Sequence, residues 1–397
     1  MSENTLKLRL HIKVLKDPDG NLVNTHENID EMVRGMKEVY STALIEVEEI
    51  TREILENSEL LADMQLTPCN GILPLSPEHE ELFNFRNGVL NGDIVAYFVR
   101  SMPSCNCDGC ASHPRDKHGV MVARGASKWT LAHEVGHLFL GFDHEDEVTN
   151  LMIGTTTHHI NDPPPDLSEE QKTQMVANGK LKGLITEHHA PPITIAAPFS
   201  LPVDTGEPSS PIQPLESRPR SRRIPLAQVE RSPVVTMEHV RAAIYSDDPD
   251  LEQVAAILGA DALPHLEEII REEHPRLAPK ALNLAALIKD ERTINIFRLA
   301  TVSKDPVIRL TAAYNLRHLN LSAVADLLLL FLNDRDLGVR KFALLAMEKY
   351  VPTELQSKIE YLRRTDPSAY IRQISDQTLV KISSPGWWRN LLNRLFN

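Results

Sequence analysis

The strongest constraint in this sequence is one apolar segment that carries three histidines. It runs Thr130-Leu-Ala-His-Glu-Val-Gly-His-Leu-Phe-Leu-Gly-Phe-Asp-His144. Side chains four residues apart lie on one face of a helix, so His133 and His137 can bind the same metal ion. Glu134 lies between them and can take a proton from a metal-activated water. The segment therefore predicts a helix that carries a zinc-dependent hydrolytic site.

The residues around this segment add to the prediction. Ser127 is a good N-cap, which indicates a helix over residues 128–140, and Gly141 suits its C-terminal end. The bracketing apolar residues would bury the first two histidines, and buried histidines need a role such as metal binding. Eight residues beyond His144 lies Met152, in Asn-Leu-Met-Ile.

These residues resemble the signature of the metzincin metallopeptidases, His-Glu-x-x-His-x-x-Gly-x-x-His followed by a methionine turn. The resemblance is position for position through His137, but one extra residue precedes Gly141. Asp143 therefore stands where the third ligand is normally found. His144 keeps the Gly-x-x-His spacing, and imidazole suits zinc well, so we favour His144 as the ligand; Asp143 is the alternative, because carboxylate is also acceptable.

The resemblance also implies a mechanism. Zinc would be held by three protein ligands with water in the fourth position, and Glu134 would pass the proton of that water to the leaving amine. Met152 would pack beneath the metal without binding it. The strand at about residues 93–102 would bind an extended peptide substrate by strand addition.

Hydrophobic periodicity predicts strands and helices over residues 1–187. The metzincin resemblance implies that they form an α+β catalytic domain with a mixed sheet and an active-site helix. Asn28 is a possible N-cap for a helix over residues 28–44, and residues 69–91 read as a loop with some helix. The other expected elements are strands over 6–15, 45–54, 93–102 and 119–123, and a helix from Ser168 to about Asn178.

A cysteine-rich loop lies between the two strands before the site helix. Cys105, Cys107 and Cys110 are spaced closely enough for a second, structural zinc, with Cys69 or His113 as the fourth ligand. A disulfide, a regulatory thiolate on the catalytic zinc, and free thiols are the alternatives. His158 and His159, beyond the methionine turn, are expected at the surface, where either could line the cleft.

Residues 188–235 form a proline-rich linker, and the chain from 236 to 383 is expected to be all-α. A basic residue recurs early in predicted helices of this region, at intervals of 29, 31 and 32 residues: Lys280, Arg309, Arg340 and Arg372. This period resembles HEAT-type repeats, which implies an α-solenoid that binds a protein substrate or partner. Residues 384–397 predict an amphipathic helix, either a cap on the last repeat or a docking helix for a membrane surface or partner.

The net charge is -13, which argues against extended nucleic-acid binding because that function needs a basic face. Without a signal peptide or a run of about 18 apolar residues, we expect a cytoplasmic protein with reduced thiols and no transmembrane segment. Two functions remain open: a zinc endopeptidase, or a solenoid scaffold whose metal domain is regulatory or inactive. The intact Glu134 favours the enzyme.

Overall fold

The computed structural model describes residues 6–56, 58–65, 75–103, 105, 107–154, 157–158, 160, 163–187, 235–245, 251–320, 323–348 and 350–383. Several predicted features therefore lie outside the described residues: Cys69, His159, nearly all of the proline-rich linker, and the amphipathic helix over residues 384–397. Within the described part of the chain, no helix has the length and apolar character that crossing a membrane requires.

A mixed sheet forms the N-terminal region, as the sequence predicts. Its order is β2 (Ile45–Ile54), β1 (Leu6–Val14), β3 (Ile94–Val99), β5 (Gly119–Ala123) and β4 (Gly109–Cys110). The first four strands of this order run parallel to one another, whereas β4 runs antiparallel to β5. A short strand, β6 (Ile185–Glu187), pairs antiparallel with the start of β1.

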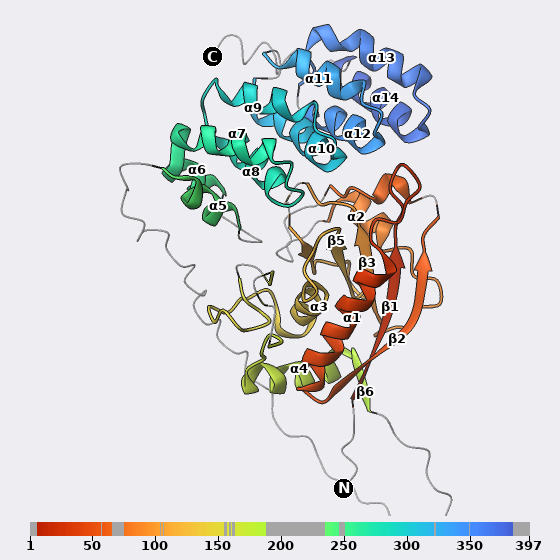
Figure 1. Ribbon diagram of the computed structural model, residues 1–397. Helices are drawn as coiled ribbons and strands as arrows, with labels where there is room; N and C mark the ends of the chain where they lie inside the picture. Colours follow the sequence, from red (N-terminus) through yellow and green to blue (C-terminus); the bar gives the residue numbers. More distant parts are fainter. Residues whose placement is uncertain are drawn as a thin grey trace, which may run out of the picture.

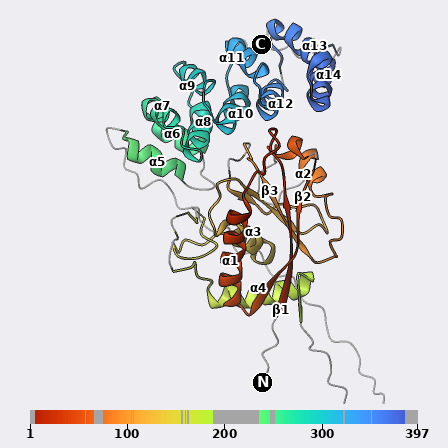
Figure 2. The same ribbon diagram turned by 45° about the vertical axis from the view of Figure 1, so that its right-hand side comes forward.

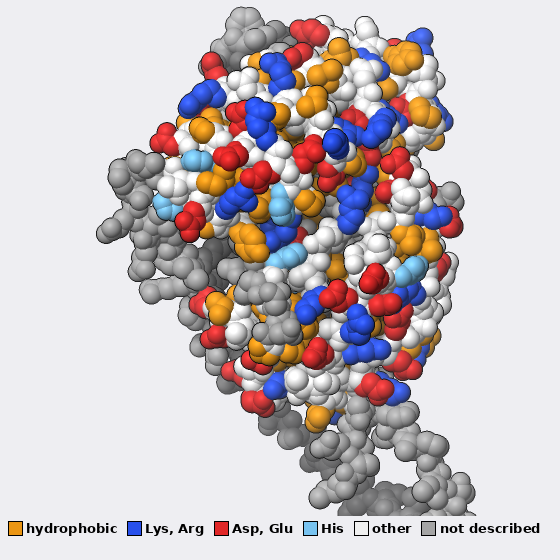
Figure 3. All heavy atoms as spheres, viewed as in Figure 1, with side chains coloured by type: hydrophobic (Ala, Val, Ile, Leu, Met, Phe, Trp, Pro, Cys, Tyr) orange, Lys and Arg blue, Asp and Glu red, His pale blue; other side chains and the backbone are white. Residues whose placement is uncertain are grey.

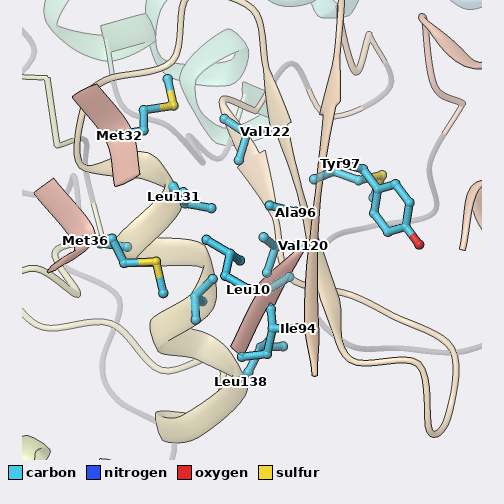
Figure 4. Close-up of a cluster of buried hydrophobic side chains, with 14 of the residues drawn as sticks. Leu10, Met32, Met36, Ile94, Ala96, Tyr97, Val120, Val122, Leu131 and Leu138 are labelled. Atoms are coloured by element: carbon cyan, nitrogen blue, oxygen red, sulfur yellow. The ribbon is translucent and has the colours of Figure 1, made fainter. Parts of the chain in front are cut away.

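Two helices, α1 (His26–Ser41) and α3 (Thr130–Leu140), cover one face of this sheet. Figure 4 shows side chains of both helices directed at the central strands. Because the apolar residues of β1 alternate, its Leu10 side chain faces the helices, and Tyr97 of β3 lies on the opposite face against Phe83. The labelled residues on the helix-covered face are Leu10, Met32, Met36, Ile94, Ala96, Val120, Val122, Leu131 and Leu138, all of them buried.

The helix boundaries depart from the sequence prediction at two N-termini and at the C-terminus of α1, which ends at Ser41 and not at residue 44. α1 begins two residues before Asn28, because the hydroxyl of Thr25 accepts the Asn28 N–H at 3.2 Å and so acts as the N-cap. α3 begins at Thr130, after a turn in which the Ser127 hydroxyl accepts the Trp129 N–H. The predicted helix after Ser168 is confirmed as α4 (Glu169–Lys182), with a capping box, and α2 (Pro77–Leu82) lies in the predicted loop.

The C-terminal region is helical, and its helices pack in chain order beside the sheet domain (Figures 1 and 2). α8, α10, α12 and α14 each contact the next member of that series, while α7, α9, α11 and α13 lie on its outer side. Short 3₁₀ helices occur in this region at 259–262, 316–318 and 353–355, and another lies in the sheet domain at 59–61. The bounds are α5 (Met237–Tyr245), α6 (Leu251–Leu258), α7 (Leu263–Arg271), α8 (Leu277–Leu287), α9 (Thr293–Ala300), α10 (Pro306–Asn315), α11 (Ala325–Leu332), α12 (Leu337–Ala346), α13 (Gln356–Thr365) and α14 (Ala369–Ser383).

The periodic arginines of the sequence join successive helix pairs. Nη1 of Arg309 and of Arg340 donates to two carbonyl oxygens in the turn before its own helix. Their remaining nitrogens bind the carboxylates of Asp334 and Asp366 in the next turn along the array. Such forked contacts are specific to arginine, which explains its recurrence at this position.

A buried group of charged side chains connects the two regions, and we call it the junction cluster: Asp63, Glu78, Arg100, Asp336 and Lys341. The Arg100 guanidinium, immediately after β3, binds Asp63 and both carboxylate oxygens of Asp336, at 2.8 and 3.0 Å. Lys341 Nζ donates to the Asp63 carbonyl and lies 2.8 Å from Glu78 Oε1. The sheet domain and the helical region are therefore in direct contact, in addition to being linked along the chain.

Replacing Asp336 tests how much the junction cluster stabilises the protein. Asp336→Ala removes one partner of a buried guanidinium, which typically costs about 3–5 kcal/mol. Asp305→Ala is the matched control: Asp305 caps α10 as Asp336 caps α12, but its ion pair with Arg124 is 3.7 Å long and partly exposed. We expect the control to lose only about 1 kcal/mol, the value of a cap.

The measurement is the free energy of unfolding in urea, followed by circular dichroism. Equal losses for the two variants would mean that the contact between Arg100 and Asp336 adds no stability beyond that of an N-cap.

Candidate metal centre

α3 presents two imidazoles on one face, one helical turn apart. The Nε2 atoms of His133 and His137 lie 3.1 Å from each other. Nδ1 of His133 contacts the carbonyl oxygen of Leu151 at 2.7 Å, and Nδ1 of His137 contacts that of Gly141 at 2.7 Å. A carbonyl only accepts, so both Nδ1 atoms carry the proton and both Nε2 atoms present bare lone pairs.

This arrangement fits a metal ion. Two lone pairs at 3.1 Å repel each other, and a cation between them removes the repulsion. Burial lowers the pKa of His133 to about 4, although its bond to Leu151 acts in the opposite direction; proximity to His144 lowers it further. Burial, with His133 and His144 nearby, also holds the pKa of His137 well below its usual range. Both imidazoles are therefore neutral at neutral pH, as metal ligands must be.

His144 completes the group. One ligand nitrogen from each of the three histidines lies within 4.8 Å of the others, and this is the one such set of three among the described residues. The neighbouring residue, Glu145, donates its N–H to the Met152 carbonyl at 2.8 Å, and Gly154 packs against the His144 Cβ. Asp143 is exposed and does not belong to this group. The structure thus brings together the ligand set that we favoured.

The helix accommodates the extra residue before the glycine. α3 continues to Leu140, and the Gly141 N–H still bonds the His137 carbonyl at 3.0 Å. Gly141 then takes φ +88°, a left-handed value that favours glycine, and turns the chain back toward the site. One more helical residue before the turn is what carries His144, rather than Asp143, to the other two histidines.

Met152 lies beneath the helix. It is buried, and its sulfur lies so close to Gly136 that a Cβ on that residue would approach Sδ to 2.6 Å. Asn150 accepts the Met152 N–H at 2.8 Å and donates to Gln171 of α4 at 2.8 Å. The sequence motifs assign no role to Gly136, Asn150 or Gln171. The sequence does contain a signal for Gly136, because a glycine inside a helix destabilises the helix and is usually found there for a packing reason.

Glu134 is buried on the same helix, beside the edge of the sheet. A Cβ on Gly109 of β4 would lie 2.3 Å from Glu134 Cγ, so the β4 backbone lies directly against this carboxylate side chain. The prediction that residues 93–102 bind substrate as an edge strand is wrong. β3 is paired with β1 on one side and β5 on the other, which leaves no free edge.

The cysteine loop adopts the disulfide alternative for all three of its cysteines. Cys105 and Cys107 are bonded, with their Cα atoms 5.2 Å apart, and Cys110 is disulfide-bonded as well. The prediction of reduced thiols is wrong for these residues, and a cytoplasmic location stays a prediction. His113 donates from Nδ1 to the Pro114 carbonyl at 2.8 Å. The predicted second zinc on Cys105, Cys107 and Cys110 is therefore wrong, because sulfurs in disulfides are not thiolate ligands; Cys69, a possible fourth ligand, lies outside the described residues.

Comparison of the chain with protein-family models and with curated protein sequences gives no match.

The ligand assignment predicts different effects for two adjacent substitutions. We expect His144→Ala to weaken zinc binding by at least tenfold, because it removes one of three ligands. Asp143→Ala, a matched exposed neighbour, is expected to leave the affinity within twofold. Competition of each purified variant against a chromophoric chelator measures both constants. Loss of zinc from Asp143→Ala with retention by His144→Ala would reverse the assignment.

Proposed function

We propose that this chain is a zinc-dependent endopeptidase. The observation that carries the proposal is the convergence of three histidine nitrogens within 4.8 Å, with a buried carboxylate one residue along the same helix. Three imidazoles are a donor set typical of catalytic zinc, which keeps its fourth position open. His133, His137 and His144 would hold the ion, with Met152 packed beneath them.

A zinc ion bound there supplies Lewis acidity, which lowers the pKa of a coordinated water to roughly 7 and polarises the scissile carbonyl. Glu134 takes the proton of the attacking water and delivers it to the leaving amine. His144 is exposed, so solvent and a polypeptide can reach the site from its side.

The substrate is expected to lie along β4. Among the described strands β4 pairs only with β5, and it passes directly against Glu134. The Asp108 carbonyl faces β5, where it accepts the Ala123 N–H at 2.8 Å. Backbone groups alternate along a strand, so those of Gly109 point to the free side, where an extended peptide can add as a further strand.

The family resemblances are part of the proposal. A metzincin-like catalytic domain is supported by the glycine turn after α3, the third histidine and the methionine beneath the helix. A HEAT-like solenoid is supported by the recurrent Arg-to-Asp contacts and by the serial packing of α8, α10, α12 and α14. In this proposal the helical region binds the protein substrate or a regulatory partner.

Replacing the general base tests the proposal. We expect Glu134→Gln to retain zinc but to cleave an unstructured fluorescent peptide at least 100-fold more slowly, because general acid–base catalysis contributes 10²–10⁴-fold. Glu147→Gln, an exposed acid in the loop after His144, is the control and should cleave within twofold of wild type. Zinc content is measured by atomic emission, and cleavage sites are read by mass spectrometry.

Two results would contradict the proposal. Cleavage by Glu134→Gln at the wild-type rate would exclude this carboxylate as the base. A wild-type protein that binds zinc but cleaves no peptide would favour the scaffold function instead.

A further inference from the structure

Asp108, at the entrance to β4, connects three segments that are distant in sequence. Its Oδ2 atom accepts a hydrogen bond from Arg276 Nε at 3.2 Å, just before α8 of the helical region. The same oxygen lies 3.0 Å from Nε2 of His158, which follows the methionine turn. Only 13% of the Asp108 side chain is exposed, so these contacts are largely shielded from solvent.

The charge of Asp108 is maintained by its neighbours. Burial alone would raise the pKa of this carboxyl group, but the hydrogen bond from His158 and the charges of Arg276 and Lys280 hold it well below its usual range. Lys280, the earliest member of the periodic basic series, is buried in α8. Its charge acts on Asp108 of the sheet domain, whereas the carboxylate partners of Arg309 and Arg340 lie within the helical region.

Arg276 is itself fixed by the helical region. Its Nη2 atom donates to the Tyr245 carbonyl at 3.2 Å, and its guanidinium lies 4.8 Å from the centre of the Tyr245 ring. The His274 Nδ1 atom accepts the backbone N–H of Arg276 at 3.2 Å. The position of Arg276 therefore follows that of α5 and of the turn before α8.

The backbone of β4 connects Asp108 to Glu134 on α3. The Asp108 carbonyl oxygen accepts a hydrogen bond from the Ala123 N–H of β5. The next residue, Gly109, lies against Glu134. A displacement of the Asp108 side chain would therefore move the strand segment that borders the general base. The contact does not bury the metal ligands completely, because His144 is exposed.

We propose that Asp108 is a positioning residue through which the helical region holds β4 beside Glu134. This inference rests on the proposed peptidase function and adds to it a means of regulation: a partner that draws Arg276 away from Asp108 slows the reaction without touching the metal site. Arg276 is the element of this link that the helical region supplies.

Kinetics on the full-length, zinc-loaded protein test the inference. We expect Asp108→Asn and Arg276→Gln to lower kcat about tenfold, because small misplacements of catalytic groups are costly, with KM and zinc content within twofold of wild type. Arg276→Lys keeps the charge and should restore at least half of kcat. Arg124→Ala is the control, since it removes a different ion pair between the regions, with Asp305, that does not involve β4.

A second readout needs neither activity nor metal. Hydrogen exchange of the peptide that spans residues 107–122 should become at least threefold faster in Arg276→Gln than in wild type or Arg124→Ala, because β4 is released. If wild type cleaves no peptide but this exchange difference appears, the proposed function fails and the link through Asp108 stands.

The inference is overturned if Arg276→Gln matches Arg124→Ala in both kcat and exchange. It is also overturned if Arg276→Gln raises kcat, since the contact would then inhibit the site instead of positioning it. Should Arg276→Gln fail to fold, Asp108→Asn gives the same comparison with Arg124→Ala.

Discussion

The relation between the two regions depends on a buried guanidinium. Arg100 follows a strand of the sheet, and its two carboxylate partners come from different regions, Asp63 from the sheet domain and Asp336 from the helical region. A buried charge without its partners is costly, so the two regions have to meet in the one register that satisfies Arg100 and Lys341 together. Gly338 permits this close approach, because a Cβ there would lie 2.3 Å from an Asp63 oxygen. The junction cluster therefore fixes where α12 lies relative to the sheet, and α10 and α8 follow because they pack against it in series.

The geometry of the metal site depends on close packing at two glycines as well as on the identity of the ligands. Glycine at 136 lets Met152 lie under the helix, and glycine at 109 lets the edge strand lie against Glu134. In both places a Cβ would lie within 2.6 Å of the neighbouring side chain, Met152 or Glu134, which would then have to leave its position. The imidazoles are oriented by carbonyl oxygens of Leu151 and Gly141, which come from the turns that follow the helix. The turns thus help to define the ligand geometry as well as ending the helix.

Much of the site could be predicted from sequence because its signals are local. The i, i+4 histidines and the glycine turn with His144 three residues on depend only on helix and turn geometry. The edge strand could not be predicted in this way, since β4 has two residues and no periodicity. The error over residues 93–102 was avoidable: Ile94–Val99 is an unbroken apolar run, and such runs indicate a strand buried on both faces, not an edge. The junction cluster pairs residues more than 200 positions apart, which no local pattern reveals.

Strand direction explains why the helical region meets the sheet where it does. Arg100 follows β3 and Arg124 follows β5, so both lie at the carboxyl ends of parallel strands. β4 is antiparallel, and its beginning therefore lies at that same edge, with Gly109 opposite Val122. All three strands thus present a charged residue to the helical region: Arg100 to Asp336, Arg124 to Asp305 and Asp108 to Arg276. Of the residues in these three contacts, only Asp108 is followed directly by a residue, Gly109, that lies against Glu134. The sheet topology therefore connects the helical region to the proposed general base without involving the metal ligands.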